Sequence, residues 1–331
     1  MRVLVTGGAG FLGSHLVERL LHGGSQVVVV DDFSTGRHMN LRRVATHPGL
    51  RVEVGSVTAP GRLVRLAGEA DALVHLAASV GVQRVLAAPR DALRRNVEGA
   101  LRVVDAAAAT GIRVLFASSS EVYGLVPRLP AHEDDPLLTG FDDAPRWGYA
   151  RSKVFGEGLL RDLRDAGAAD TLSVRLFNTV GPRQVGDHGM VLPRFVDAAL
   201  ADRPLVVHGD GSQRRAFAHV GDVALALARL LALDSFVGNG HHAVNVGGTT
   251  ETSMLELAQA VLRRTGSRSS VVHAALVDSA GRAVPETPRR VPSLARLEQL
   301  VGRPPTRTLD ELIDSAVRQR RLEAGHVGVR A

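Results

Sequence analysis

The amino-acid sequence predicts an α/β protein built on a doubly wound parallel sheet, followed by a smaller α/β lobe. Three observations support this prediction. Short β-branched runs alternate with longer helical patterns through the first half, a glycine-rich turn joins the first run to the first helix, and the alternation becomes irregular after Asn178. We therefore expect residues 1–177 to form the doubly wound domain and residues 178–331 mainly the second lobe, with some later segments returning to the first domain.

The strands and helices can be placed in order along the chain. Buried parallel strands are expected at residues 2–6, 27–31, 51–54, 72–76, 113–117 and 172–177. Between them, amphipathic patterns predict helices at 11–22, at 92–110 with Gly111 as the stop, and from near Tyr149. In the second half we expect helices at 191–201, 220–233, 253–265 and 309–320, with short strands at 205–207 and 243–246.

The charge composition does not favour a nucleic-acid binder. The net charge is +6, but the arginines are dispersed along the chain instead of forming one basic stripe, so no nucleic-acid partner is expected. Of the 40 lysines and arginines, a single one is lysine, Lys153. A solitary lysine in such a sequence marks a position where the permanently charged, planar guanidinium of arginine is unsuitable.

Other sequence features exclude several kinds of site. The chain has no cysteine, which removes disulfides and thiolate metal sites and agrees with a reducing compartment, so we expect a cytoplasmic protein. No apolar run is long enough for a membrane span, and no membrane association is expected. The run His132-Glu133-Asp134-Asp135 lacks the spacing of metal ligands, so we expect no metal.

The turn after the first strand predicts a dinucleotide site. In Thr6-Gly7-Gly8-Ala9-Gly10-Phe11-Leu12-Gly13, the first glycine of the motif allows the tight turn, the second allows backbone to approach a pyrophosphate, and Gly13 allows close helix packing. The second strand ends in Asp31-Asp32, where a carboxylate can bind the adenosine ribose and repel a 2′-phosphate. This pattern predicts NAD in preference to NADP.

A second group of residues predicts proton transfer. The fifth strand runs into Ser118-Ser119-Ser120-Glu121, and the next helix carries Tyr149 and Lys153 four residues apart on one face. We expect the lysine ammonium to lower the phenol pKa, so that Tyr149 acts as a base near neutral pH beside the strand-end hydroxyls.

Together these motifs resemble the extended short-chain dehydrogenase/reductase superfamily of nucleotide-sugar epimerases, dehydratases and decarboxylases, over nearly the whole chain. The resemblance implies a Rossmann domain, tightly held NAD, a C-terminal nucleotide-sugar lobe and a homodimer formed through the helices after Ala92 and Tyr149. It implies a catalytic group of Ser119, Ser120, Glu121, Tyr149 and Lys153. The cofactor contacts that we expect are Gly7, Gly10, Phe11, Leu12, Gly13, Asp31, Asp32, Leu76, Ala77, Ala78 and Asn96, with Tyr149 and Lys153.

Within the superfamily, Glu121 favours chemistry beyond C4 of the sugar. Simple 4-epimerases generally have a small or apolar residue at this position, whereas decarboxylases and dehydratases have glutamate. The segments Arg146-Trp147, 178–183 and 211–217 look most like UDP-glucuronate decarboxylases. A UDP-sugar 4-epimerase and a nucleotide-sugar 4,6-dehydratase stay open as alternatives, and so does a catalytically silent NAD-binding protein.

The resemblance also gives an expected course of reaction and a set of substrate contacts. Oxidation at C4, with Tyr149 taking the hydroxyl proton, makes the C6 carboxylate part of a β-keto acid, which loses carbon dioxide. Glu121 with Ser120 is then expected to stabilise the enolate and donate a proton to it. Candidate substrate-binding residues are Asn178, Arg183, Arg194, Arg215 and Arg290, with Arg215 expected to orient the departing carboxylate. Ser56, Ser293 and residues 284–288 depart from the family pattern, which leaves the nucleotide and the sugar open.

Overall fold

A computed structural model of the chain describes residues 1–81, 85, 87–126, 128–137, 147–186, 189–277, 281, 287–302 and 306–327. Arg146 and residues 284–286, which entered the comparison of sequence motifs, lie outside the described residues.

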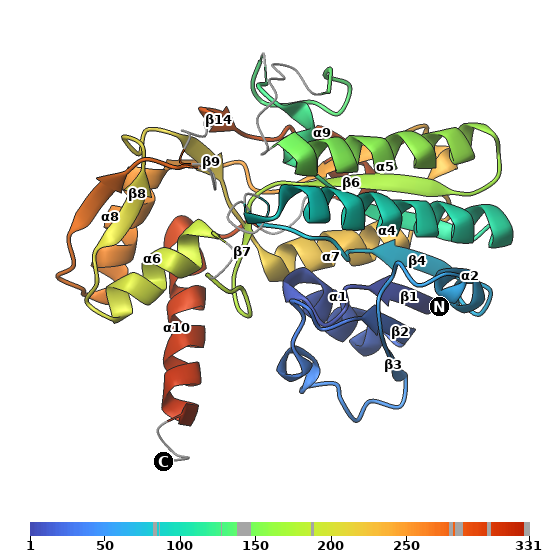
Figure 1. The fold of residues 1–331 in the computed structure, drawn as a ribbon, viewed down its shortest axis with the longest axis horizontal. Coiled ribbons are helices and arrows are strands. Elements are labelled where there is room, and N and C mark those ends of the chain that lie inside the picture. Colours follow the sequence, from blue (N-terminus) through green and yellow to red (C-terminus); the bar gives the residue numbers. More distant parts are fainter. Residues whose placement is uncertain are drawn as a thin grey trace.

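A seven-stranded parallel sheet is the centre of the described structure (Figure 1). From one edge to the other its strands are β11 (Ala243–Val246), β6 (Thr171–Leu176), β5 (Arg113–Ser119), β4 (Ala72–His75), β1 (Arg2–Thr6), β2 (Gln26–Asp31) and β3 (Leu50–Val54). The chain reverses direction across the sheet between β1 and β4, as in a doubly wound fold. This arrangement confirms the fold class predicted from the sequence.

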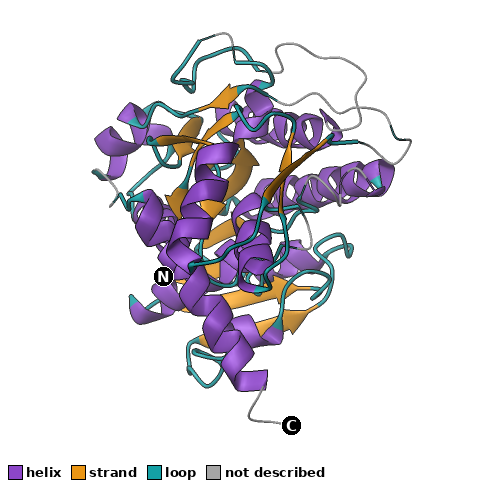
Figure 2. Ribbon diagram, turned by 90° about the vertical axis from the view of Figure 1, so that its left-hand side faces the viewer, coloured by secondary structure: helices purple, strands orange, loops and turns teal. Residues whose placement is uncertain are grey.

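Helices cover both faces of this sheet because successive side chains of each strand point to opposite faces. Val3 and Val5 pack in the layer of α1 (Phe11–His22), α7 (Val220–Leu231) and α9 (Ala295–Val301). Leu4, between them, packs in the layer of α2 (Arg62–Ala67), α4 (Pro89–Thr110) and α5 (Trp147–Asp165). Figure 2, turned by 90°, shows the strands between the helices. Helix α4 ends at Gly111, which has a positive φ of 67°, as the sequence predicts.

A second core lies beyond the carboxyl edge of the sheet. It is formed by α6 (Val191–Leu200), α8 (Met254–Thr265), α10 (Leu309–Val327) and the parallel pair β8 (Leu205–His208) and β13 (Val271–Ala274). Next to it, β9 (Arg214–Ala216) pairs with β12 (Glu251–Ser253) and with β14 (Arg289–Arg290), while β7 (Thr179–Val180) pairs with β10 (Ala218–His219). Three short 3-10 helices, η1 (His38–Leu41), η2 (Ser120–Tyr123) and η3 (Val237–Asn239), complete the described elements.

The structure differs from the sequence prediction mainly in its short elements. Strand β1, helix α1 and strand β11 have the predicted bounds, and the other predicted elements differ by a few residues at their ends, most of all α10, which extends to Val327. The sequence placed residues 243–246 in the irregular half, but β11 pairs in parallel with β6 and completes the main sheet. Helices α2 and α9 and the short strands β7, β9, β10, β12, β13 and β14 were missed, because segments this short give little periodic signal.

Gly156 of α5 offers a test of the packing between this helix and the sheet. A Cβ atom there would lie 2.5 Å from Cζ of Phe116, a buried side chain that is 1% exposed, so the ring or the helix must shift. We expect Gly156→Ala to lower the free energy of unfolding by about 1–3 kcal/mol, measured by urea denaturation. Gly158→Ala is the matched control: nothing lies within 4 Å of its Cβ, so it should stabilise the helix by roughly 0.5–1 kcal/mol. Equal effects of the two changes would contradict this packing.

Candidate active site

A cavity of about 820 Å³ opens at the carboxyl edge of the main sheet and reaches into the second core. Segments that follow β1, β2, β4, β5 and β6 line one side, and residues of α6, β8, β9 and β14 line the other. Open α/β sheets bind ligands at this edge, at the point where the strand order reverses.

The glycine loop forms a narrow cradle at one end of the cavity. Gly7, with a φ of +72°, would place a Cβ 2.7 Å from the backbone nitrogen of Ala77. A Cβ on Gly13 would overlap the carbonyl oxygen of Gly7. Helix α1 begins at Phe11 with Gly10 as its N-cap and no side-chain cap, so its first N–H groups and its positive dipole end are left for an anion. These residues therefore fit the pyrophosphate of a dinucleotide.

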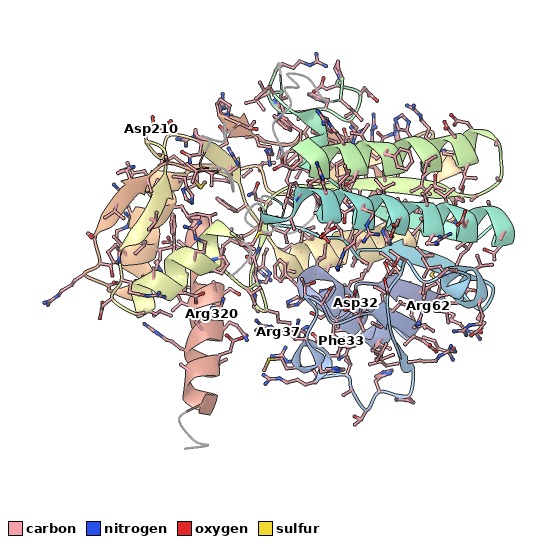
Figure 3. The ribbon with its side chains drawn as sticks, viewed as in Figure 1. Asp32, Phe33, Arg37, Arg62, Asp210 and Arg320 are labelled. Atoms are coloured by element: carbon pink, nitrogen blue, oxygen red, sulfur yellow. The ribbon has the colours of Figure 1, made fainter. Side chains whose placement is uncertain are left out.

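Asp31 ends β2, Asp32 follows it, and both line the cavity. Figure 3 labels Asp32 with its neighbours Phe33 and Arg37. The Asp31 carboxylate is 6% exposed and accepts hydrogen bonds of 2.9 Å from the backbone N–H groups of Ala9 and Phe33. Burial raises its pKa, and these two hydrogen bonds oppose that shift. Asp31 thus braces the glycine loop as well as lining the cavity, a role that the motif alone does not reveal.

The loop after β4 forms a further wall of the same cavity. Leu76, Ala77 and Ala78 line it. Asn96 of α4 holds this loop in place: its Oδ1 accepts a 2.7 Å hydrogen bond from the backbone N–H of Ser79, and its Nδ2 donates to the Ser79 carbonyl at 3.3 Å. Phe11, Leu12 and Asn96 also line the cavity.

Tyr149 and Lys153 face the cavity from the first turns of α5. The Lys153 side chain is buried, its Nζ donates a 2.7 Å hydrogen bond to the Ala117 carbonyl, and it lies 5.9 Å from the centroid of the Tyr149 ring. Burial lowers the pKa of Lys153 to about 8, although the negative charge of Glu157 opposes this. The ammonium is therefore close to losing its proton under mildly alkaline conditions.

The pKa of Tyr149 differs from the sequence-based expectation. Without cofactor or substrate, burial is the main cause that raises the pKa of Tyr149, and the negative charge of Glu121 raises it further. A hydrogen bond with Ser119 opposes both effects. The expected lowering by Lys153 is not found, although its Nζ lies 5.9 Å from the centroid of the Tyr149 ring; this ammonium donates its hydrogen bond to the Ala117 carbonyl. The phenol is consequently protonated near neutral pH until further positive charge reaches it.

Glu121 forms an ion pair that joins the two halves of the chain. Its Oε1 accepts a 2.7 Å hydrogen bond from Nη1 of Arg290, and the two side chains are 20% and 7% exposed. Both residues line the cavity, as do Ser119 and Ser120. A carboxylate, an arginine, two hydroxyls and a phenol therefore surround the same space.

The other candidate substrate residues do not all reach this space. Asn178, Arg194 and Arg215 line the cavity; Nη1 of Arg194 lies 3.2 Å from Nε2 of His208, and Nη1 of Arg215 donates to the Arg214 carbonyl at 2.8 Å. Arg183 is not part of the cavity lining. It pairs with Glu18 of α1, because its backbone has a positive φ of 71° and its side chain lies against that helix.

Several cavity residues were missed by the sequence analysis. They include Thr35, Ser79, Gln184, Met190, Gln213 and Phe217. Gln184 and Met190 lie in the irregular half outside any motif, whereas Gln213 and Phe217 belong to the segment 211–217, of which only Arg215 was assigned a role. The described part of the chain contains no group of three or more histidine and carboxylate side chains placed to hold a metal ion. In those same residues, no helix combines the length and the apolar character of a membrane span.

Comparisons with known proteins identify the family of this chain. A family model described as the NAD dependent epimerase/dehydratase family matches residues 3–247. The chain is 35% identical over 300 residues to UDP-N-acetyl-alpha-D-glucosaminuronate decarboxylase of Bacillus cytotoxicus. The matched region covers 90% of this chain and 91% of that relative. It is 32% identical over 330 residues to UDP-glucuronic acid decarboxylase 1 of Danio rerio, with coverages of 98% and 74%.

A solved structure gives the same result in three dimensions. The dTDP-glucose 4,6-dehydratase DesIV of Streptomyces venezuelae, with NAD and TYD bound, has a TM-score of 0.85 and 31% sequence identity and covers 98% of each chain. The fold is the one that the superfamily resemblance implied. The chain belongs to the NAD dependent epimerase/dehydratase family.

Proposed function

We propose that this protein is an NAD-dependent decarboxylase of UDP-glucuronate. The observation that carries the proposal is the Glu121–Arg290 ion pair beside Ser119 and Tyr149, because it places a cation and a carboxylate where a sugar acid would react. Relatives named as decarboxylases of UDP-linked uronic acids match nearly the whole chain and support it. The alternatives are a 4-epimerase or a 4,6-dehydratase on the same scaffold.

The first step is oxidation at C4 of the sugar. Bound NAD supplies the hydride acceptor for this carbon. Tyr149 takes up the proton of the 4-hydroxyl, and its hydrogen bond with Ser119 favours the anionic form that this requires. Asp31, the glycine loop and Asn96 hold the walls of the cofactor end of the cavity.

The second step is loss of the C6 carboxylate, which is now β to the 4-ketone. The C5–C6 bond breaks, carbon dioxide leaves, and the bonding electrons form an enolate over C5, C4 and the ketone oxygen. Arg290 stabilises the negative charge of this enolate. Because Arg290 also keeps Glu121 in its carboxylate form, Glu121 is not the proton donor. We therefore assign protonation of C5 to Ser120, or to a water molecule that Glu121 orients.

The direct test is incubation of the purified protein with UDP-glucuronate and NAD, with products followed by mass spectrometry and NMR. We expect loss of carbon dioxide, giving UDP-xylose or its 4-keto relative. Tyr149→Phe should slow the reaction by roughly 10²–10⁴-fold, because the proton acceptor at the 4-hydroxyl is removed. An unchanged mass with inverted C4 would identify an epimerase instead, and release of water from a UDP- or dTDP-hexose would identify a dehydratase.

The Glu121–Arg290 pair can be tested separately from the oxidation step. Glu121→Gln and Arg290→Met should each slow carbon dioxide release by about 10²-fold or more, while NADH still forms during a single turnover, measured by absorbance. Arg289→Met is the matched control, because Arg289 is the adjacent residue of β14 and pairs with Glu251 at 2.6 Å on the exposed side. An equal loss in the Arg289 variant would refute a specific role for the pair.

We also propose that the protein is a homodimer formed through α4 and α5. These helices pack beside each other (Figure 1) on the face of the sheet opposite α1 and α7, and each leaves a large apolar side chain exposed, Leu101 at 38% and Phe155 at 42%. The cytoplasmic location expected from the cysteine-free sequence stays a prediction.

Light scattering after size exclusion tests the dimer. The parent protein should have twice the chain mass of 35.1 kDa, and Phe155→Glu should shift it toward that single-chain mass, because a buried unpaired carboxylate opposes association. Leu322→Glu, a change of an apolar side chain on α10 that is 59% exposed, should leave the mass unchanged. A parent protein of 35.1 kDa would rule the dimer out.

A further inference from the structure

Five polar side chains form a buried network directly behind the candidate catalytic residues: Ser118, Tyr123, Glu157, Arg175 and Asn245. We propose that this network is a positioning device for the reaction: it fixes the segment 119–121, the Lys153 turn of α5 and the strand that carries Arg290 relative to one another. The kinetic part of the proposal rests on the proposed function.

The centre of the network is an ion pair between neighbouring elements of the sheet layer. Arg175, the last residue but one of β6, is 2% exposed, and Glu157 of α5 is 7% exposed. Nη2 of Arg175 donates to Oε2 of Glu157 at 2.8 Å, and Nε donates to both carboxylate oxygens at 3.1 and 3.2 Å. A well-packed apolar pair would stabilise the fold as well as such an ion pair does, so stability alone does not account for it.

One part of the network connects the end of β5 to α5 by hydrogen bonds. Ser118 donates a hydrogen bond to Oε1 of Glu157, and Lys153 donates to the carbonyl of the preceding residue, Ala117. Lys153 and Glu157 are four residues apart on one helix face, so two successive residues of β5 are held by two successive turns of α5. Ser119, the next residue, is thereby fixed relative to Tyr149.

A second part holds the short helix that carries Glu121. Nη1 of Arg175 donates to the hydroxyl of Tyr123 at 3.1 Å, and that hydroxyl donates to Oδ1 of Asn245 at 2.7 Å. Burial raises the pKa of Tyr123 to about 12, so its hydroxyl keeps the proton that it donates. Tyr123 ends η2, which begins at Ser120, and its fixed ring therefore sets the place of Ser120 and Glu121.

The third part extends to the strand of Arg290. Nδ2 of Asn245 donates to the carbonyls of Ala131 and Ser293, at 3.0 and 3.3 Å. Ala131 in turn receives a 2.8 Å hydrogen bond from the Ser293 N–H and donates one to the Val291 carbonyl. Val291 follows Arg290 directly, so the network fixes both partners of the Glu121–Arg290 pair.

The network also contributes charge at Lys153. The titratable groups around this ammonium are His75 of β4, Tyr149 and Glu157 of α5, Glu121 of η2 and, behind Glu157, Arg175 of β6. Burial lowers the pKa of Lys153, and Glu157 raises it. Removing the Glu157 charge therefore removes the support for the ammonium, and the proton should leave at lower pH.

Three variants and one control test the proposal by kinetics. Ser118→Ala, Tyr123→Phe and Glu157→Gln should each lower kcat by about tenfold or more, because small displacements of reacting groups are costly, with the affinity for NAD unchanged. Thr171→Val is the matched control: this buried hydroxyl also lies on β6, but it donates to the Leu160 carbonyl at 2.8 Å, away from the network. Equal kcat values in Tyr123→Phe, Ser118→Ala and the control would overturn the proposal.

A second measurement does not depend on catalysis. Because Lys153 is the single lysine of the chain, protein labelled with [ε-13C]lysine gives one side-chain signal, and its pH titration by NMR reports this ammonium directly. The titration midpoint should fall in Glu157→Gln and stay at the parent value in Thr171→Val. An unchanged midpoint in folded Glu157→Gln would overturn the link between Glu157 and Lys153. If the parent released no carbon dioxide, the proposed function would fail while this titration would still decide the link.

Discussion

The parallel direction of the seven strands is the constraint on which this site depends. Parallel strands end at one edge of the sheet, so the segments after β1, β2, β4, β5 and β6 meet there although they are far apart in the sequence. The glycine loop, the paired aspartates and the serine run therefore share one cavity. The second core adds the opposite wall, and β14 brings Arg290 to Glu121 across 169 positions of sequence.

The sequence predicted what local pattern determines. The strands β1, β2, β4 and β5 are largely apolar runs, and Tyr149 and Lys153 face the same cavity because they are one helical turn apart. The expected burial of residues 51–54 was wrong, because β3 lies at the edge of the sheet, where Val52 and Val54 are 38% and 64% exposed. The sequence did not predict the Glu121–Arg290 pair, which depends on how β14 pairs with β9, nor the place of Arg183, which depends on a backbone turn with positive φ. An arginine inside the apolar run of β6 was a signal for the buried network, since a charge in such a strand requires a partner.

The single lysine of an arginine-rich chain has a physical explanation in the structure. Its site is a narrow buried position between the Phe116 ring, the Ala117 carbonyl and the Tyr149 ring, which accepts a compact ammonium. A planar guanidinium has more N–H donors than this position has acceptors, and each buried donor without an acceptor is costly. Arginine also keeps its charge at any physiological pH, whereas burial here lowers the pKa of Lys153 to about 8.

The raised pKa of Tyr149 has a further consequence for the oxidation step. Near neutral pH the phenol of the protein alone keeps its proton, because burial and Glu121 both oppose the anion and only the Ser119 hydrogen bond favours it. Positive charge near the phenol would lower its pKa, and oxidised NAD bound at the cofactor end of the cavity would supply such a charge. Glu121, which we assign to the decarboxylation step, therefore also opposes formation of the Tyr149 anion that the oxidation step needs. The positive charge of Arg290 beside Glu121 weakens this effect.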